Sequence, residues 1–113
     1  MDKVSWFAVK CLFLHKDLKK RNRKSNYEER ILLVKAKDFD EAIEKAENEA
    51  LEYCDELGKD VEYLKFCNAY HISESKIGNK TEIYSLIIKS DLNKTDFINT
   101  HHDNGGELTK RIE

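Results

Sequence analysis

The sequence predicts an α+β fold in which one long amphipathic helix packs on one face of a four-stranded, mostly antiparallel sheet. Four segments are rich in β-branched and aromatic residues, and a charged segment between the second and third has helical periodicity. A helix-capping signal follows the fourth segment. The predicted order is β-β-α-β-β-α in a single domain, 1–113, with a long basic hairpin loop at 16–26 and a loosely held tail at 103–113.

The first two predicted strands are residues 4–15 and 27–37. In the first, apolar side chains occupy both alternating faces, which is typical of a central strand or of one covered on two sides. One face would pack on the helix. The other needs cover from the last helix or from a second copy of the chain, because it carries large apolar side chains: Trp6, Leu12 and Leu14.

Residues 38–57 carry the clearest helical signal. Asp38 and Glu41 have the spacing of a capping box, and Gly58 stands where a left-handed residue would end the helix. Apolar residues recur at three- and four-residue intervals, which predicts one buried stripe. Its members are Phe39, Ala42, Ile43, Ala46, Ala50, Tyr53, Cys54 and Leu57.

Two further strands are predicted at 61–73 and 82–90, followed by a short helix around 95–101. Either Asp91 or Asn93 could cap this last helix, because both side chains can accept a hydrogen bond from its first turn.

Composition excludes several classes of protein. The chain has no apolar run of membrane-spanning length, and its start lacks the basic and apolar regions of a secretory signal. Its three cysteines form no C-x-x-C pair, which is typical of buried thiols in a reducing compartment. We therefore expect a cytoplasmic protein that does not bind membranes.

The charges are segregated along the chain. Residues 1–37 carry 11 basic and 4 acidic side chains, a net charge of +7, whereas residues 38–60 carry 2 and 10, a net charge of −8. On the predicted helix, the acidic residues lie opposite the apolar stripe, with one leucine beside them. This acidic helix face is the predicted partner-binding surface: Glu41, Glu44, Glu52, Asp55, Glu56 and Leu51.

The leading hypothesis is a non-enzymatic protein-binding domain, most concretely an immunity protein that neutralises a nuclease-like toxin. Toxins that cut nucleic acid have basic clefts, so an acidic surface would be steered to them and could cover them. The other interpretation is an ordinary soluble helix without such a partner. A homodimer is a further assembly that the sequence allows.

A nucleic-acid-binding module is the first alternative, and it depends on the basic loop alone. Phosphates could contact its cations, but the loop has no aromatic residue for base stacking, and the acidic helix repels nucleic acid. A solvated loop is the simpler interpretation. The candidate contacts are Lys19, Lys20, Arg21, Arg23 and Lys24.

A small enzyme of unknown reaction is the second alternative. The sequence has no catalytic or cofactor-binding motif, so an active site would need residues distant in sequence to converge, for example Arg30, Tyr70, His71 and Tyr84. We expect no cofactor and no metal site. Cys67 and His71 share a strand face but stand roughly 13 Å apart, at about 3.3 Å per residue, too far to hold one ion.

Four short blocks resemble a known family in their order and spacing. They are Trp6-Phe7-Ala8-Val9-Lys10, Tyr27-Glu28-Glu29-Arg30-Ile31, Asp40-Glu41-Ala42-Ile43-Glu44-Lys45-Ala46 and Thr81-Glu82-Ile83-Tyr84-Ser85-Leu86. Over most of residues 5–98 the chain is similar to the small bacterial family called domain of unknown function 4288. The resemblance implies a stand-alone bacterial domain and brings no assigned activity and no catalytic residues.

Overall fold

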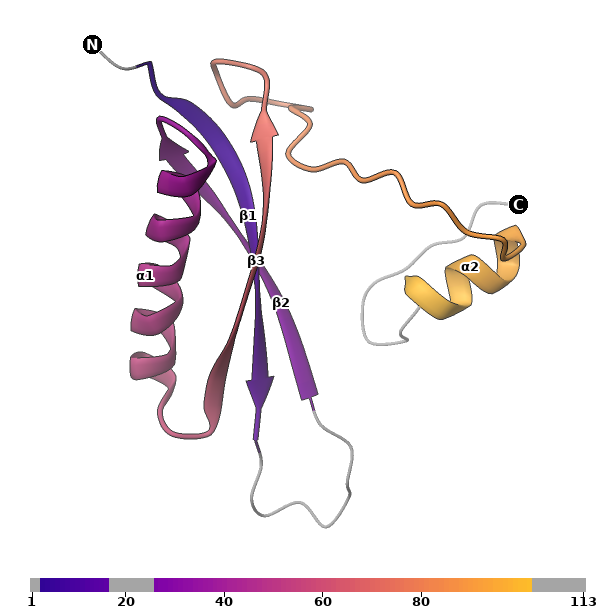
Figure 1. The fold of residues 1–113 in the computed structure, drawn as a ribbon, viewed down its shortest axis with the longest axis horizontal. Coiled ribbons are helices and arrows are strands. Elements are labelled where there is room, and N and C mark those ends of the chain that lie inside the picture. The colour runs from indigo at the N-terminus through magenta and orange to yellow at the C-terminus, as the bar shows by residue number, and fades with distance from the viewer. Residues whose placement is uncertain (1–2, 17–25, 103–113) are drawn as a thin grey trace.

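The computed structural model describes residues 3–16 and 26–102, and these form an α+β unit. Figure 1 shows a helix lying along a narrow twisted sheet, and a second, shorter helix standing apart from both. The elements are β1 (Ser5–His15), β2 (Asn26–Ala36), α1 (Phe39–Leu57), β3 (Val61–Ile72) and α2 (Lys94–His101).

The sheet has three antiparallel strands in the order β2-β1-β3, so the predicted four-stranded sheet is wrong. In the described part of the chain the order is β-β-α-β-α, with two helices of 19 and eight residues. Residues 82–90 form no strand there. Their composition suits a strand, but composition does not by itself pair a strand with a neighbour. β1 is paired along both edges, and in the described residues the outer edges of β2 and β3 pair with no further strand.

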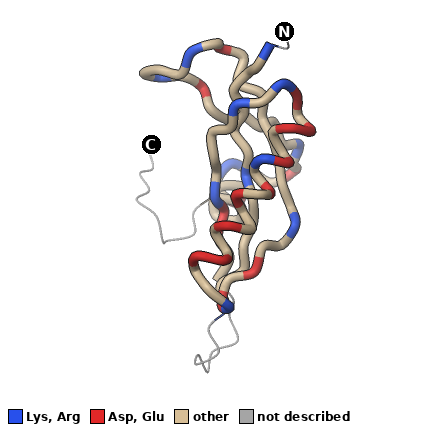
Figure 2. Tube along the Cα trace, turned by 90° about the vertical axis from the view of Figure 1, so that its left-hand side faces the viewer, with Lys and Arg blue, Asp and Glu red and all other residues tan. Residues whose placement is uncertain are grey.

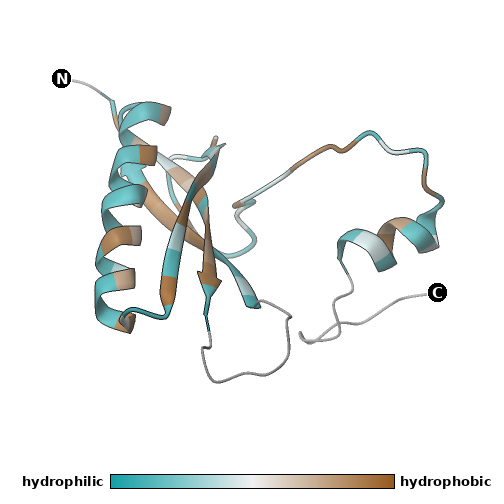
Figure 3. Ribbon diagram, turned by 60° about the horizontal axis from the view of Figure 1, so that its bottom comes forward, coloured by the Kyte–Doolittle hydropathy of each residue, from teal (hydrophilic) through white to brown (hydrophobic). Residues whose placement is uncertain are grey.

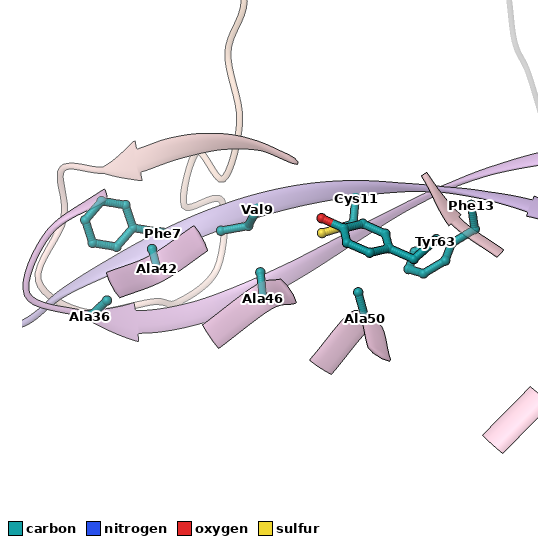
Figure 4. Close-up of a cluster of buried hydrophobic side chains, with 9 residues drawn as sticks. All are labelled: Phe7, Val9, Cys11, Phe13, Ala36, Ala42, Ala46, Ala50 and Tyr63. Atoms are coloured by element: carbon teal, nitrogen blue, oxygen red, sulfur yellow. The ribbon is translucent and has the colours of Figure 1, made fainter. Parts of the chain in front are cut away.

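The register of the strands divides the sheet into two faces. Residues directly opposite each other share a face, so Phe7 lies with Val34 of β2 and His71 of β3. This first face packs on α1 and holds the core, drawn in Figure 4. The buried cluster comprises Phe7, Val9, Cys11, Phe13, Ala36, Ala42, Ala46, Ala50 and Tyr63.

Helix α1 presents only alanines among its fully buried residues. Ala42, Ala46 and Ala50 recur every fourth residue and point to the sheet, where the larger side chains of β1 fill the space (Figure 4). Phe13 has no exposed surface, and its ring centroid lies 5.1 Å from that of Tyr53 and 5.6 Å from that of Tyr63. The helix therefore approaches the sheet closely, and β1 supplies most of the bulk of the core.

The ends of α1 have the predicted caps. The Asp38 side chain accepts a hydrogen bond from the Glu41 backbone N–H at 2.8 Å. At the other end, Gly58 has a φ of 98° and donates its N–H to the carbonyl of Cys54 at 2.9 Å. A positive φ is costly for other residues, so Gly58 sets the point where the chain leaves the helix and turns into β3.

The second face of the sheet is only partly covered. Trp6, Leu12 and Leu14 are half-buried, while Ile31 and Leu33 of β2 are each 47% exposed. Among the described residues, α2 packs against no strand and does not supply the cover expected of the last helix. An extended segment, residues 73–93, crosses from β3 to α2 and carries its own exposed apolar stretch (Figure 3).

Two substitutions to alanine, one in the core and one in this extended segment, should differ in their effect on stability. We expect Phe13→Ala to lower the free energy of unfolding by about 3–5 kcal/mol, because it empties the centre of the core. Ile87→Ala should change it by less than about 0.5 kcal/mol, because Ile87 is 93% exposed. Urea unfolding followed by circular dichroism measures both values, and a large loss from Ile87→Ala would show that residues 82–90 are packed in solution.

Candidate protein-binding surfaces

Most of the predicted acidic helix face is exposed. Glu44, Glu52, Asp55 and Glu56 lie on the side of α1 that faces away from the sheet, and Leu51 beside them is 56% exposed. Figure 2 shows acidic positions following one another along this helix. Since α1 has no basic residue in its last turn, the carboxylates of that turn meet no cation from their own helix there.

Glu41 differs from the other predicted members of this face. Its Oε1 accepts a hydrogen bond from the Lys37 backbone N–H at 3.2 Å and lies 3.4 Å from Lys45 Nζ. Lys45 Nζ also donates to the carbonyl of Lys35 at 2.7 Å. The half-buried Glu41 thus links the start of α1 to the end of β2. Its carboxylate already has partners within the chain.

A groove of about 400 Å³ runs between α1 and β3. Glu44 and Leu51, both predicted to bind a partner, line it together with residues that the sequence did not single out. The full lining is Asp40, Ile43, Glu44, Glu47, Asn48, Leu51, Tyr63 and Lys65. The charged members of the lining are three carboxylates and one lysine, so the groove is acidic on balance. Together with its apolar residues, this suits a basic group attached to an apolar body.

Two glutamates of α1 turn toward the sheet instead of solvent. Glu47 accepts a hydrogen bond from the Tyr63 hydroxyl at 2.8 Å, and Glu49 lies 3.5 Å from Arg30 Nη2. The guanidinium carbon of Arg30 also lies 4.0 Å from the centroid of the Tyr53 ring. Helical periodicity places these glutamates at the edges of the buried stripe, but only the partners on β2 and β3 show why charge is tolerated there.

A second polar cluster lies where β1 ends and β2 begins. The Tyr53 hydroxyl donates to Glu28 at 2.8 Å from Oε2, and His15 Nε2 lies 2.8 Å from Glu28 Oε1. Burial by itself would raise the pKa of Glu28, but the hydrogen bonds from His15 and Tyr53 outweigh it, so the pKa of Glu28 is lower than usual. The ionised carboxylate of Glu28 consequently stabilises the fold.

The open face of the sheet has a hollow of its own, of about 570 Å³. Lys10, Glu29 and Ile31 line its sheet side. The segment before α2, and α2 with its C-cap residue, line the rest: Tyr84, Ser85, Leu86, Ile88, Phe97, His101 and His102. The hydroxyl of Tyr84 is buried without a hydrogen-bond partner among the described residues. The homodimer that the sequence allows stays a prediction.

The residues of the hypothetical enzyme do not converge. Arg30 and His71 lie on the α1-facing side but on β2 and β3, which β1 separates. Tyr70 lies on the opposite face, where its ring centroid is 5.9 Å from that of Tyr84. Two of the four side chains are thus on each side of the sheet, and they cannot share one active site.

The basic loop and the tail fall outside the described residues. The predicted nucleic-acid contacts Lys19, Lys20, Arg21, Arg23 and Lys24 all lie within 17–25, and Asp103 lies beyond the last described residue. Across the two described ranges no group of three or more histidine, cysteine or acidic side chains is arranged to hold a metal ion. In those same ranges no helix is both long and apolar enough to cross a membrane.

Comparison with protein families gives one match. The model of the family described as "Domain of unknown function (DUF4288)" matches residues 6–85, which include β1, β2, α1 and β3. The chain belongs to this family. The DUF4288 match covers the groove between α1 and β3 and ends within the apolar segment that precedes α2. Comparisons with curated proteins and with solved structures found no match.

The stability of two alanine variants, at Glu41 and at Glu44, tests the capping role of Glu41. Glu41→Ala should lower the free energy of unfolding by about 0.5–2 kcal/mol, because a backbone N–H at the start of α1 loses its acceptor. Glu44→Ala, three residues further on the same helix, should change it by less than about 0.5 kcal/mol. Equal stability of the two variants in chemical unfolding would contradict the assignment of Glu41 to the cap.

The lowered pKa of Glu28 makes the fold sensitive to acid. Its stabilisation is present at pH values above the usual glutamate pKa of 4.5 and is lost as the pH falls through the lower pKa of the folded state. We therefore expect Glu28→Gln to be less stable than the wild type at pH 7, with a difference that shrinks steadily below pH 4.5. Unfolding free energies measured across this range test it, and a constant difference would refute it.

Proposed function

We propose that this DUF4288 domain is a non-enzymatic protein-binding domain, and most concretely an immunity protein that covers the basic cleft of a nuclease-like toxin. The observation that carries the proposal is the groove between α1 and β3, where carboxylates occur together with the exposed Leu51. A docking surface needs both: charge to attract and orient the partner, and apolar area to hold it.

Electrostatics supports an attraction to basic partners. The segment that contains α1 carries a net charge of −8, and Glu44, Glu52, Asp55 and Glu56 are all exposed. Summed over one helix, such charges raise the association rate with a cationic surface, and salt weakens the effect because exposed charges are screened. A cleft that binds nucleic acid is cationic by necessity, so it is the surface that α1 fits best.

The apolar part of the groove supports a stable complex rather than a passing encounter. Leu51 is 56% exposed on the helix, and Ile43 and Tyr63 form the floor beside it. Burying Leu51 against a partner would remove apolar area from water at about 25 cal/mol per Å². The acidic residues around it would then form the polar rim of the interface.

The experiment measures association with the protein encoded by the adjacent gene. The variant Glu44→Gln/Asp55→Asn removes two charges from α1 and leaves the cap residue Glu41 in place. We expect its association rate to fall about tenfold at low ionic strength and to lose most of its salt dependence. Leu51→Ala should instead speed dissociation about tenfold or more.

The matched control is Glu74→Gln/Asp91→Asn, which changes the net charge by the same amount at exposed positions away from α1. It should associate like the wild type. If both double variants slow association equally, net charge rather than the α1 face is responsible. If the wild type does not bind its neighbour at all, the immunity proposal fails.

A further inference from the structure

Two of the three cysteines face each other across the sheet. Cys11 on β1 and Cys67 on β3 are direct partners in the strand register, and their Sγ atoms lie 3.0 Å apart. Both are free thiols, and 56 residues separate them in sequence. The third cysteine, Cys54, lies on α1 at the margin of the same core.

The backbone around this pair suits a covalent bond. Opposed residues of antiparallel strands have Cα atoms about 4.5–5.5 Å apart, within the range of about 4.4–6.8 Å that a disulfide bridges. The two sulfurs would have to close from 3.0 Å to about 2.05 Å, a shift that side-chain rotation can supply. A register irregularity begins directly after Cys11, and Lys65 within it has a φ of 57°, so the ladder between β1 and β3 is interrupted on that side of the pair.

The two thiols differ in their access to solvent. Cys11 is 2% exposed, whereas Cys67 is half-buried. The Tyr63 hydroxyl lies 2.9 Å from Cys67 Sγ and donates its own proton to Glu47, which lines the groove. An oxidant therefore reacts with Cys67 first, and the buried Cys11 reacts second.

We propose that Cys11 and Cys67 form a reversible intramolecular disulfide by exchange with a small disulfide such as oxidised glutathione. The Cys67 thiolate attacks one sulfur of oxidised glutathione, forming a mixed disulfide and releasing one glutathione thiolate. The Cys11 thiolate then attacks Cys67 Sγ, forming the Cys11–Cys67 bond and releasing the second glutathione. The two cysteines lose two protons and two electrons, and the oxidant is reduced to two thiols.

The setting of Cys11 makes the second step slow. Burial, followed by the hydrogen bond with Cys67, raises the pKa of Cys11 to about 12, so its thiolate is scarce at neutral pH. The proximity of the two sulfurs offsets this scarcity, because the attack is intramolecular. The pair thus responds to a sustained change in redox conditions rather than to a brief pulse.

Peptide mapping of the full-length wild-type protein tests the proposal. The folded protein is incubated with excess oxidised glutathione, quenched in acid, unfolded, alkylated and digested. We expect a linked peptide that joins Cys11 to Cys67, and alkylation of Cys54 alone. The oxidised protein should also melt at a temperature at least about 5 °C higher, because the bond closes a long loop in the unfolded chain.

Three serine variants provide the controls. Cys54→Ser should form the same bond as the wild type, Cys11→Ser should stop at a glutathione adduct on Cys67, and Cys67→Ser should gain no adduct at the buried Cys11. The wild-type mapping does not depend on whether a variant folds. Alkylation of all three cysteines after prolonged oxidation, a persistent adduct on wild-type Cys67, or a bond that includes Cys54 would each overturn the proposal.

Discussion

The structure depends on the burial of β1 beneath the alanine stripe of α1. β1 pairs with β2 on one side and β3 on the other, so the two outer strands are held by the same central strand. Phe7, Val9, Cys11 and Phe13 project from it toward Ala42, Ala46 and Ala50. Small residues on the helix and large ones on the strand allow the two layers to approach closely and to bury these side chains.

This arrangement also decides where charge can lie on α1. The helix sits close to the sheet, so glutamates at the edges of its apolar stripe come within reach of polar groups on the strands. Glu47 meets Tyr63, and Glu49 meets Arg30. The carboxylates farther round the helix have no strand beneath them and remain in solvent. One helix therefore provides structural carboxylates at its edges and an acidic surface on its outer side, and the groove with Leu51 lies where the two meet.

The second face of the sheet, opposite α1, leaves apolar surface exposed. This face is only partly covered, because α2 packs against no strand among the described residues (Figure 1). Ile83, Leu86, Ile87 and Ile88 add exposed apolar area in the segment between β3 and α2. Apolar surface of this extent is typical of proteins that associate with others, and it supports a binding role independently of the acidic helix.

Local patterns in the sequence determined several elements. The spacing of Asp38, Glu41 and Gly58 fixed the ends of α1, because caps and left-handed turns depend on nearby residues. Segments rich in apolar and strand-favouring residues predicted β1, β2 and β3. Two possible caps, Asp91 and Asn93, predicted the short last helix, which Asn93 caps. The order of four short blocks also indicated the DUF4288 family, which the family comparison showed.

Only the tertiary structure decided how these elements are paired and which charges remain free. Residues 82–90 have the composition of a strand, but a strand forms only when it pairs with a distant backbone edge, and a sequence pattern does not record whether that pairing occurs. Glu41 and Glu44 are alike in sequence, yet one caps the helix and the other lines the groove. Cys11 and Cys67 are 56 residues apart, and only the register of β1 against β3 brings their sulfurs together. Periodicity determines which side of an element is apolar, whereas contacts between distant residues determine what that side meets.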